Sequence, residues 1–216
     1  APLPQAVSPR FTWERAQDLV VDRFASYSDE LAAFARRALD RGWVDVPPRR
    51  GKRSGAFCSS VHARAESRVM LNFGGNLSDV FTLAHELGHA YHNDCKFRFG
   101  RTALQSPTPM TLAETASIFC ETLLFDGLMA GVEEAERLAV LEQNLQGATQ
   151  LLLDIHTRFL FEAEVFERRA ERELSADELD AVMDAAQARV FGDALAEDAR
   201  HPLMWAHKPH YYSSDR

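Results

Sequence analysis

Three of the chain's eight histidines lie within the apolar segment TLAHELGHAYHNDC, residues 82–95. Apolar residues recur through this segment at helical spacing, which predicts a helix from about Asp79 through His92. In a helix, positions four apart share a face, so His85 and His89 of the pattern HExxH can present nitrogen atoms to a single Zn²⁺ ion. Burying such polar side chains in an apolar helix is costly unless a metal ion or hydrogen bonds satisfy them. The segment therefore predicts a buried helix with one polar, metal-binding face.

Glu86 directly follows the first of these histidines and lies beside both of them around the helix. There it can accept a proton from metal-bound water and pass it to a leaving amine, which is the role of a general base. A chance match of HExxH to a charged helix face is expected in about one chain of this length in a hundred. The apolar neighbours of the pattern make that explanation weaker still. Glu86 is therefore the candidate catalytic base.

A catalytic zinc site needs a third protein ligand and an open position for water. The best candidate is Glu114, 25 residues after His89 in the segment TLAETASIFCETLLF. Glu121 lies two helical turns further along the same face, where it can hydrogen-bond a ligand histidine. A simpler explanation is that both glutamates belong to a solvent-exposed face of the helix. Their apolar neighbours disfavour this explanation: Leu112, Ala113, Ala116, Ile118, Phe119 and Leu123. His92 shares the face of the HExxH histidines, and support of a ligand and burial in the core explain it about equally well.

The rest of the sequence is mostly helical in pattern. Apolar periodicity and cap residues predict helices at 12–26, 28–42, 111–128 and 175–192, and a helical region at 133–172 that is broken near Gly147 if at all. Two short segments rich in β-forming residues, 55–61 and 67–73, are predicted to pair as strands. The chain is therefore predicted to be mainly α with a small β element.

Composition and charge exclude several classes of protein. A formal net charge of −8 argues against a nucleic-acid-binding surface, which needs a clustered excess of basic residues. No stretch approaches the about 20 apolar residues that span a membrane, and the N-terminus lacks the layout of a signal peptide. Cys58, Cys95 and Cys120 are widely spaced, which is typical of free thiols in a reducing compartment. We therefore expect a cytoplasmic protein that binds neither nucleic acid nor membranes.

The segment HELGHAYH, followed at this spacing by PMTLAETASIFCE, resembles the oligoendopeptidase F branch of the thimet oligopeptidase family of zinc metallopeptidases. Further segments resemble that branch in the same order along nearly the whole chain: APLP, FTWERA, GWVDVPPRRGKRSGAFC, VMLNFGGNLSDV and MWAHKPHYY. The resemblance implies a zincin-like, mainly helical clamshell with a small β-sheet beside the active-site helix. It also implies one Zn²⁺ ion per chain at the floor of a deep channel, which admits short unfolded peptides and excludes folded proteins.

The same resemblance implies a role for each residue of the site. It implies that the zinc ligands are His85, His89 and Glu114. It implies that Glu86 is the general base and that Glu121 supports a ligand histidine. It further implies that the strand at 67–73 lies beside the cleft and hydrogen-bonds an extended peptide, a mode of binding that suits broad sequence tolerance. We expect Met70 and Asn72 of this strand to contact the substrate.

The two ends of the chain depart from the family pattern. Members of the family are far longer, and this chain starts where their N-terminal helical half would be complete, so residues 1–216 are expected to be one catalytic domain that associates with missing portions of its own chain. At the other end, His210, Tyr211 and Tyr212 match the start of a segment whose tyrosines help to bind the oxyanion and substrate. Without the resemblance, a surface turn around Pro209 would explain His210 better. Because the later tyrosines of the segment are absent, the chain alone is expected to be weakly active or inactive.

Two other functions remain open at this point. One is a non-catalytic peptide-binding module on a peptidase scaffold, which has little use for Glu86 beside the metal ligands. The other is a different zinc hydrolase, such as an amidase or deacetylase. A zinc endopeptidase accounts for the most residues.

Overall fold

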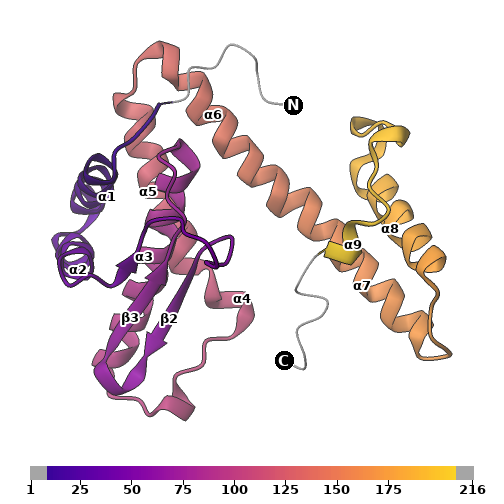
Figure 1. The fold of residues 1–216 in the computed structure, drawn as a ribbon, viewed down its shortest axis with the longest axis horizontal. Helices are drawn as coiled ribbons and strands as arrows, with labels where there is room; N and C mark the ends of the chain where they lie inside the picture. Colours follow the sequence, from indigo (N-terminus) through magenta and orange to yellow (C-terminus); the bar gives the residue numbers. More distant parts are fainter. Residues whose placement is uncertain (1–8, 208–216) are drawn as a thin grey trace. The chain divides into compact units, whose positions relative to one another are not determined.

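The first two helices begin at cap residues that the sequence predicts. The structure, a computed structural model, describes residues 9–207. Helix α1 (Trp13–Tyr27) follows Thr12, and helix α2 (Asp29–Asp40) follows Ser28, and each hydroxyl accepts a backbone N–H of the first turn. Both helices turn an apolar face inward, and α2 leads into the small sheet (Figure 1).

Two compact units divide the chain, Ala1–Asn144 and Leu145–Arg216. The first unit holds the sheet and the helix that carries HExxH, whereas the second consists of helices. The expectation of a single catalytic domain over residues 1–216 stays a prediction. Among the helices of residues 9–207, none combines the length and the apolar character needed to cross a membrane.

In the described part of the first unit, three strands form one sheet in the order β1-β3-β2. The central strand β3 (Glu66–Met70) runs parallel to β1 (Val44–Asp45) and antiparallel to β2 (Phe57–Val61). Strand β2 lies within the predicted segment 55–61, whereas β3 begins one residue before the predicted segment 67–73 and ends at Met70; the pairing of the two is confirmed. Their order decides which backbone groups are free, because a central strand is hydrogen-bonded on both sides.

Helix α3 (Leu77–Arg98) carries HExxH and packs beside the sheet. Asn76 and Asp79 form a capping box at its start, where the N–H of Asp79 donates to the Asn76 side chain at 2.9 Å. This cap lies before the predicted start, and the helix continues almost to Gly100, so α3 is longer at both ends than the predicted 79–92. Its inner face is completely buried at Val80, Leu83, Ala84 and Leu87.

The helix expected at 111–128 is interrupted at Glu114. A short helix α4 (Met110–Ala113) ends there, and α5 (Thr115–Gly131) begins directly after it. The backbone of Glu114 has φ −91° and ψ 0°, a turn-like conformation in which the chain changes direction. Helix α5 then lies against α3, with apolar residues buried at Cys120, Leu124 and Leu128.

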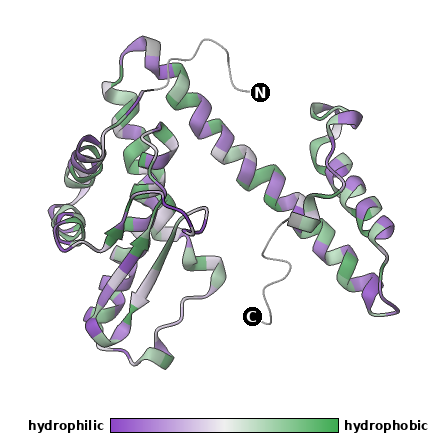
Figure 2. Cartoon of the chain, in the orientation of Figure 1, coloured by the Kyte–Doolittle hydropathy of each residue, from purple (hydrophilic) through white to green (hydrophobic). Residues whose placement is uncertain are grey.

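Helix α6 (Glu134–Thr149) runs into α7 (Ile155–Arg169) through a π-helical turn at Gln150–Asp154. The irregularity therefore follows Gly147 rather than coinciding with it. Hydrophobic and hydrophilic residues alternate along α7, as Figure 2 shows, which is the pattern of a helix with one buried face.

The second unit is held together by the packing of α7 on α8 (Ala176–Phe191). Its small core consists of Phe161, Val182, Met183 and Ala186. Helix α8 begins with the predicted capping box, in which the Ser175 hydroxyl accepts the N–H of Glu178 and the Glu178 carboxylate accepts the N–H of Ser175.

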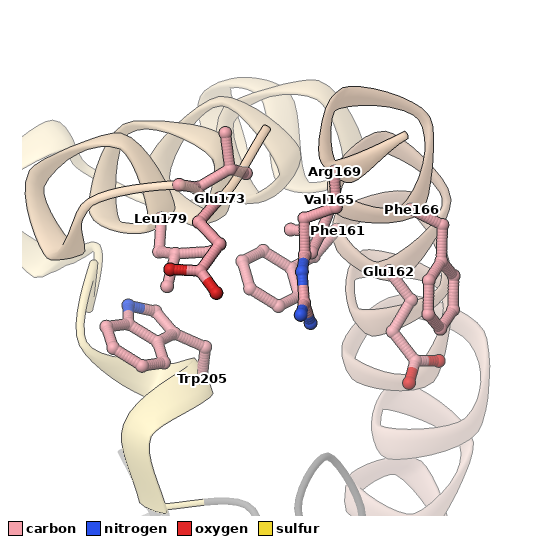
Figure 3. A pocket seen from close by; sticks show the side chains of 9 residues that line it. Phe161, Glu162, Val165, Phe166, Arg169, Glu173, Leu179 and Trp205 are labelled. Carbon is pink, nitrogen blue, oxygen red and sulfur yellow. The ribbon is translucent and has the colours of Figure 1, made fainter. Parts of the chain in front are cut away.

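Helix α9 (Met204–His207) is tied to α8 by a hydrogen bond of 2.7 Å from the indole N–H of Trp205 to Asp180. Beside it lies a pocket of about 250 Å³, into which Arg169 and Glu173 point in Figure 3. Its apolar lining comes from Phe161, Val165, Phe166, Leu174, Leu179 and Trp205. None of the predicted site residues within 9–207 lines this pocket, and those residues all lie in the first unit.

Candidate metal centre

Three predicted ligands meet between α3 and α5. The Nε2 atoms of His85 and His89 lie 3.1 Å apart. One carboxylate oxygen of Glu114, Oε2, lies 3.2 Å from the first and 3.1 Å from the second of these nitrogens. Spacing on α3 brings the histidines together, since they are one helical turn apart, and the turn at Glu114 brings the carboxylate to them. Two segments of the chain therefore place three ligand atoms in a nearly equilateral triangle.

The size of this triangle suits zinc. Zn²⁺ binds nitrogen and carboxylate oxygen at about 2.0–2.2 Å, and in a tetrahedron such bonds separate the ligand atoms by about 3.3–3.6 Å. The observed separations of 3.1–3.2 Å are close to that range. Two imidazoles and one carboxylate also form a known donor set for catalytic zinc, which leaves a fourth position open. His85, His89 and Glu114 therefore fit a zinc ion in both geometry and chemistry.

Glu121 lies behind the first of the histidines. With the proton on Nδ1, His85 donates a hydrogen bond of 2.5 Å to Oε1 of Glu121. This bond leaves the lone pair of Nε2 directed toward Glu114 and His89, which is the tautomer a metal requires. Burial pulls the pKa of His85 down, but Glu121 together with Glu86 and Glu114 outweighs burial and raises it. Glu121 thus contacts one of the two HExxH histidines; its role in supporting a metal ligand stays a prediction.

His89 has the opposite electrostatic balance. Burial lowers the pKa of His89, the carboxylate of Glu114 opposes that effect, and His85 and His92 reinforce it. His89 therefore favours its neutral form, which is the form that can bind a metal ion.

Glu86 is the buried carboxylate of the group, with 5% of the residue exposed. Burial raises its pKa to about 7; the nearby His85 lowers it, and Glu114 and Glu121 raise it again. Its Oε2 atom is buried and has no hydrogen-bond partner among the residues of the described part of the chain. Unpartnered buried oxygens are rare because they lose their hydration without replacement. A buried carboxylate with a raised pKa, under the electrostatic influence of His85, Glu114 and Glu121, is chemically suited to take up and release a proton near neutral pH.

Glu114 is less buried than its sequence neighbours suggest. Its side chain is 53% exposed, and Leu112, Ile118 and Phe119 beside it are exposed as well. The argument from apolar neighbours is therefore wrong for Glu114, because these residues do not face a core in this unit. What supports Glu114 as a ligand is its distance to the two histidines.

His92 is half-buried one turn further along α3. Burial, followed by the nearby charge of Lys96, lowers its pKa. Within residues 9–207 it forms no hydrogen bond with either HExxH histidine, so its influence on the centre is electrostatic. Which of its two expected roles applies stays a prediction.

The side chains of the two residues expected to contact substrate from the strand at 67–73 make contacts within the fold itself. Met70 is buried, and the side-chain amide of Asn72 donates to the carbonyls of Arg53 and Gly55 at 2.7 and 3.0 Å. The expectation that this strand offers a hydrogen-bonding edge is wrong, because β3 lies between β1 and β2. Strand order depends on contacts distant in sequence, which the local pattern does not contain.

Within residues 9–207 the sheet has two edge strands, the two-residue β1 and the five-residue β2, so its longer edge belongs to β2. Val69 and Leu71 donate their N–H groups toward β1, so the backbone groups of the alternate β3 residues, Glu66, Arg68 and Met70, point toward β2. Their partners in β2 are positions 61, 59 and 57. Because successive residues of a strand point their backbone groups to opposite sides, the N–H and C=O groups of Cys58 and Ser60 point away from the sheet. Burial raises the pKa of the Cys58 thiol to about 12; a hydrogen bond with Ser67 opposes this effect, and the charge of Glu86 adds to it.

Two residues near the ligands were not singled out by the sequence pattern. The hydroxyl of Ser117 lies 2.8 Å from Oε2 of Glu114. A Cβ atom added to Gly88, inside HELGH, would lie 2.7 Å from Ala116 O and 2.7 Å from Ser117 Cα. The contact between Ser117 and Glu114 has one signal in the sequence, because residues three apart on a helix are neighbours on its surface. The predicted site residues His210, Tyr211 and Tyr212 lie outside the described residues.

Comparison with known proteins agrees with these features. Residues 17–215 match peptidase family M3. Oligopeptidase PepF of Bacillus subtilis (strain 168) is 29% identical over 98% of this chain and 32% of its own length. The chromosomal oligoendopeptidase F of Lactococcus lactis subsp. cremoris is 29% identical over 92% of this chain and 32% of its own length. A crystal structure of a candidate peptidase from Chlamydophila abortus has a TM-score of 0.72 at 26% identity, over 99% of this chain and 36% of that one.

This chain therefore spans about one third of the length of the relatives that it matches. The resemblance to oligoendopeptidase F is confirmed by the names of these relatives, and the mainly helical fold with a small sheet is confirmed by the structural match. Since the family match covers nearly all of the sequence, this chain belongs to peptidase family M3.

Proposed function

We propose that this chain carries the centre of a zinc-dependent endopeptidase that hydrolyses short unfolded peptides. The observation that carries the proposal is the triangle of His85, His89 and Glu114, with Glu86 buried beside it and Glu121 behind it. The relatives named oligopeptidase and oligoendopeptidase support the class of substrate.

In this proposal, His85, His89 and Glu114 hold one Zn²⁺ ion. When bound, zinc supplies a Lewis acid that polarises the scissile carbonyl and makes a water molecule more acidic. Glu86 accepts the proton of the attacking water on its unpartnered oxygen and returns that proton to the amine that leaves. In the metal-free chain, burial raises the pKa of Glu86 to about 7, and a nearby cation favours the ionised form that can accept a proton.

Glu121 contributes by fixing a ligand. Its hydrogen bond holds the His85 ring and keeps the proton on Nδ1, so that Nε2 stays available to the metal. Partners of this kind are worth about 10–100-fold in metal affinity or activity.

The peptide itself is proposed to add to the free edge of β2. The outward backbone groups of Cys58 and Ser60 can bond to an extended main chain, and bonds to the main chain do not select side chains. An extended edge also excludes substrates that keep their own secondary structure. His210, Tyr211 and Tyr212 are proposed to contact the substrate and its oxyanion, and the channel walls are proposed to come from other parts of a longer protein. With three unpaired cysteines, a reducing cytoplasm is the proposed location.

Metal content tests the ligand set. We would measure zinc by elemental analysis in the wild-type chain, Glu114→Ala and Glu86→Gln, with His156→Ala as a control for loss of an exposed histidine outside the site. Wild type, Glu86→Gln and the control should each hold about one zinc per chain, and Glu114→Ala should lose most of it. Equal zinc in Glu114→Ala and wild type would contradict the ligand set.

Peptide cleavage tests the reaction. Mass spectrometry of unstructured peptides and of acylated small molecules, each incubated with the zinc-loaded chain, would identify the bond that is cut. Cleavage inside peptides by wild type, lost in Glu86→Gln while zinc is retained, is the expected result. Cleavage of acylated small molecules alone would favour an amidase or deacetylase.

A further inference from the structure

Ser117 lies next to the candidate ligand Glu114, one turn along α5. It is completely buried, at 0% exposure. Its hydroxyl oxygen is 2.8 Å from Oε2 of Glu114, the same oxygen that lies 3.2 Å from His85 and 3.1 Å from His89. A buried hydroxyl therefore touches the one atom of Glu114 that faces both histidines.

The hydroxyl has a second acceptor within reach, the backbone carbonyl of Glu114 at 3.0 Å. That carbonyl already accepts the N–H of Ile118 at 3.0 Å. A serine hydroxyl has a single hydrogen to donate, and a hydrogen bond to a charged acceptor is stronger than one to a neutral carbonyl. The carboxylate is therefore the favoured acceptor of the Ser117 hydrogen.

Packing leaves this serine little freedom to move. The backbone of α3 at Gly88 approaches so closely that an added Cβ would lie 2.7 Å from Cα of Ser117. Glu114, in contrast, has a side chain that is 53% exposed and a backbone at a break between two helices. The rigid member of the pair is Ser117, and the member that needs an anchor is Glu114.

We propose that Ser117 is a positioning residue, whose hydroxyl holds the Glu114 carboxylate with Oε2 directed at His85 and His89. The inference rests on the proposed zinc site and adds to it the residue that presets its third ligand. An exposed glutamate loses rotamer entropy when it binds a metal. A glutamate that is already held loses less, so Ser117 should strengthen zinc binding without touching zinc.

The test compares Ser117→Ala with Thr122→Ala. Thr122 lies on the same helix, is exposed, and donates its hydroxyl to the carbonyl of Ile118 at 3.0 Å, with no site residue involved. We would measure the zinc dissociation constant by competition with a chelator, and the unfolding midpoint of the chelator-treated chains. Ser117→Ala should raise the dissociation constant about tenfold or more, and Thr122→Ala should leave it unchanged. The midpoints of the two variants should lie close together.

A double variant separates positioning from general structure. If Ser117 acts through Glu114, then Ser117→Ala should have no further effect on zinc affinity in a Glu114→Ala chain, because the carboxylate it positions is gone. An equal effect in both backgrounds, or an effect matched by lost stability of the metal-free chain, would overturn the inference. So would a zinc-binding wild type with an unchanged Ser117→Ala variant, while the proposed zinc site would stand. A wild-type chain that binds no zinc would overturn both.

Discussion

Gly88 offers the most direct test of how the centre is assembled. It lies inside HELGH on α3, where the backbone of α5 comes into contact. A Cβ atom at this position would lie 2.7 Å from the carbonyl oxygen of Ala116, 2.7 Å from Cα of Ser117 and 3.1 Å from the carbonyl carbon of Ala116. These are backbone atoms, so a rotamer change cannot relieve the clash. Gly88→Ala must therefore move α5 away from α3 or distort one of the two helices.

The size of the displacement follows from these distances. Ordinary contact begins at 3.4 Å, so an approach of 2.7 Å requires a movement of about 0.7 Å. Metal sites keep their ligand distances within about 0.2 Å, and Glu114 is carried by the segment that must move while His85 and His89 are not. Overpacking of this kind costs about 1–3 kcal/mol of folding stability, partly offset by the helix propensity of alanine, worth up to about 1 kcal/mol. We expect Gly88→Ala to lower both stability and zinc affinity, the latter at least tenfold.

Gly147→Ala is the matched control. Gly147 lies in helix α6, and a Cβ atom there would meet nothing within 4 Å. The same substitution should stabilise the chain slightly, by up to about 1 kcal/mol. Urea unfolding of the chelator-treated variants and zinc titration by chelator competition would measure both effects. If Gly88→Ala were as stable as wild type and bound zinc equally well, close packing at this glycine would not set the position of Glu114.

Three further predictions concern charged groups. The pKa of Glu86 is about 7 in the fold against an ordinary 4.5, so its ionisation opposes folding increasingly from about pH 4.5 to 7. Glu86→Gln should therefore raise the free energy of unfolding of the chelator-treated chain by about 3 kcal/mol at pH 8 and hardly at pH 4. Equal gains in urea unfolding at both pH values would contradict this. Glu121→Ala should weaken zinc binding about 10–100-fold, and Glu121→Gln, which keeps an acceptor, should weaken it less; chelator competition on both variants checks the order. The hydrogen bond from Arg172, followed by that from the N–H of Ser175, lowers the pKa of Glu178 to about 2, so its stabilisation is present above about pH 4.5 and is lost as the pH falls toward 2. Glu178→Gln should flatten the acid limb of the stability curve, followed by circular dichroism, and an unchanged limb would show that this ion pair carries no net stability.

Features that depend on neighbours in sequence were predictable. The caps at Thr12, Ser28 and Ser175 each satisfy a backbone N–H within three residues, so the local sequence contains the whole interaction. The same holds for His85 and His89, whose approach follows from one turn of a helix.

Features that depend on distant contacts were not predictable in the same way. The central place of β3 is decided by pairing with Val44 and Asp45, more than twenty residues away, so the edge was assigned to the wrong strand. The break at Glu114 has no proline or glycine to signal it. Burial around Glu114 also failed as a prediction, because apolar residues in a sequence do not say which of them face a core.

The geometry of the centre explains why its ligands need several kinds of restraint. Glu86, Glu114 and Glu121 place three carboxylates around two imidazoles, an arrangement whose mutual repulsion is relieved by a cation. Without one, the chain must hold these groups together by other means: Glu121 fixes His85, Ser117 is proposed to fix Glu114, and contact at Gly88 fixes the spacing of the helices. Each restraint comes from a different interaction, so each can be removed singly while the others persist. If the proposed zinc site is built in this way, its affinity should fall in separate steps as each restraint is removed, whereas the affinity of a site held only by its ligands would be lost at once.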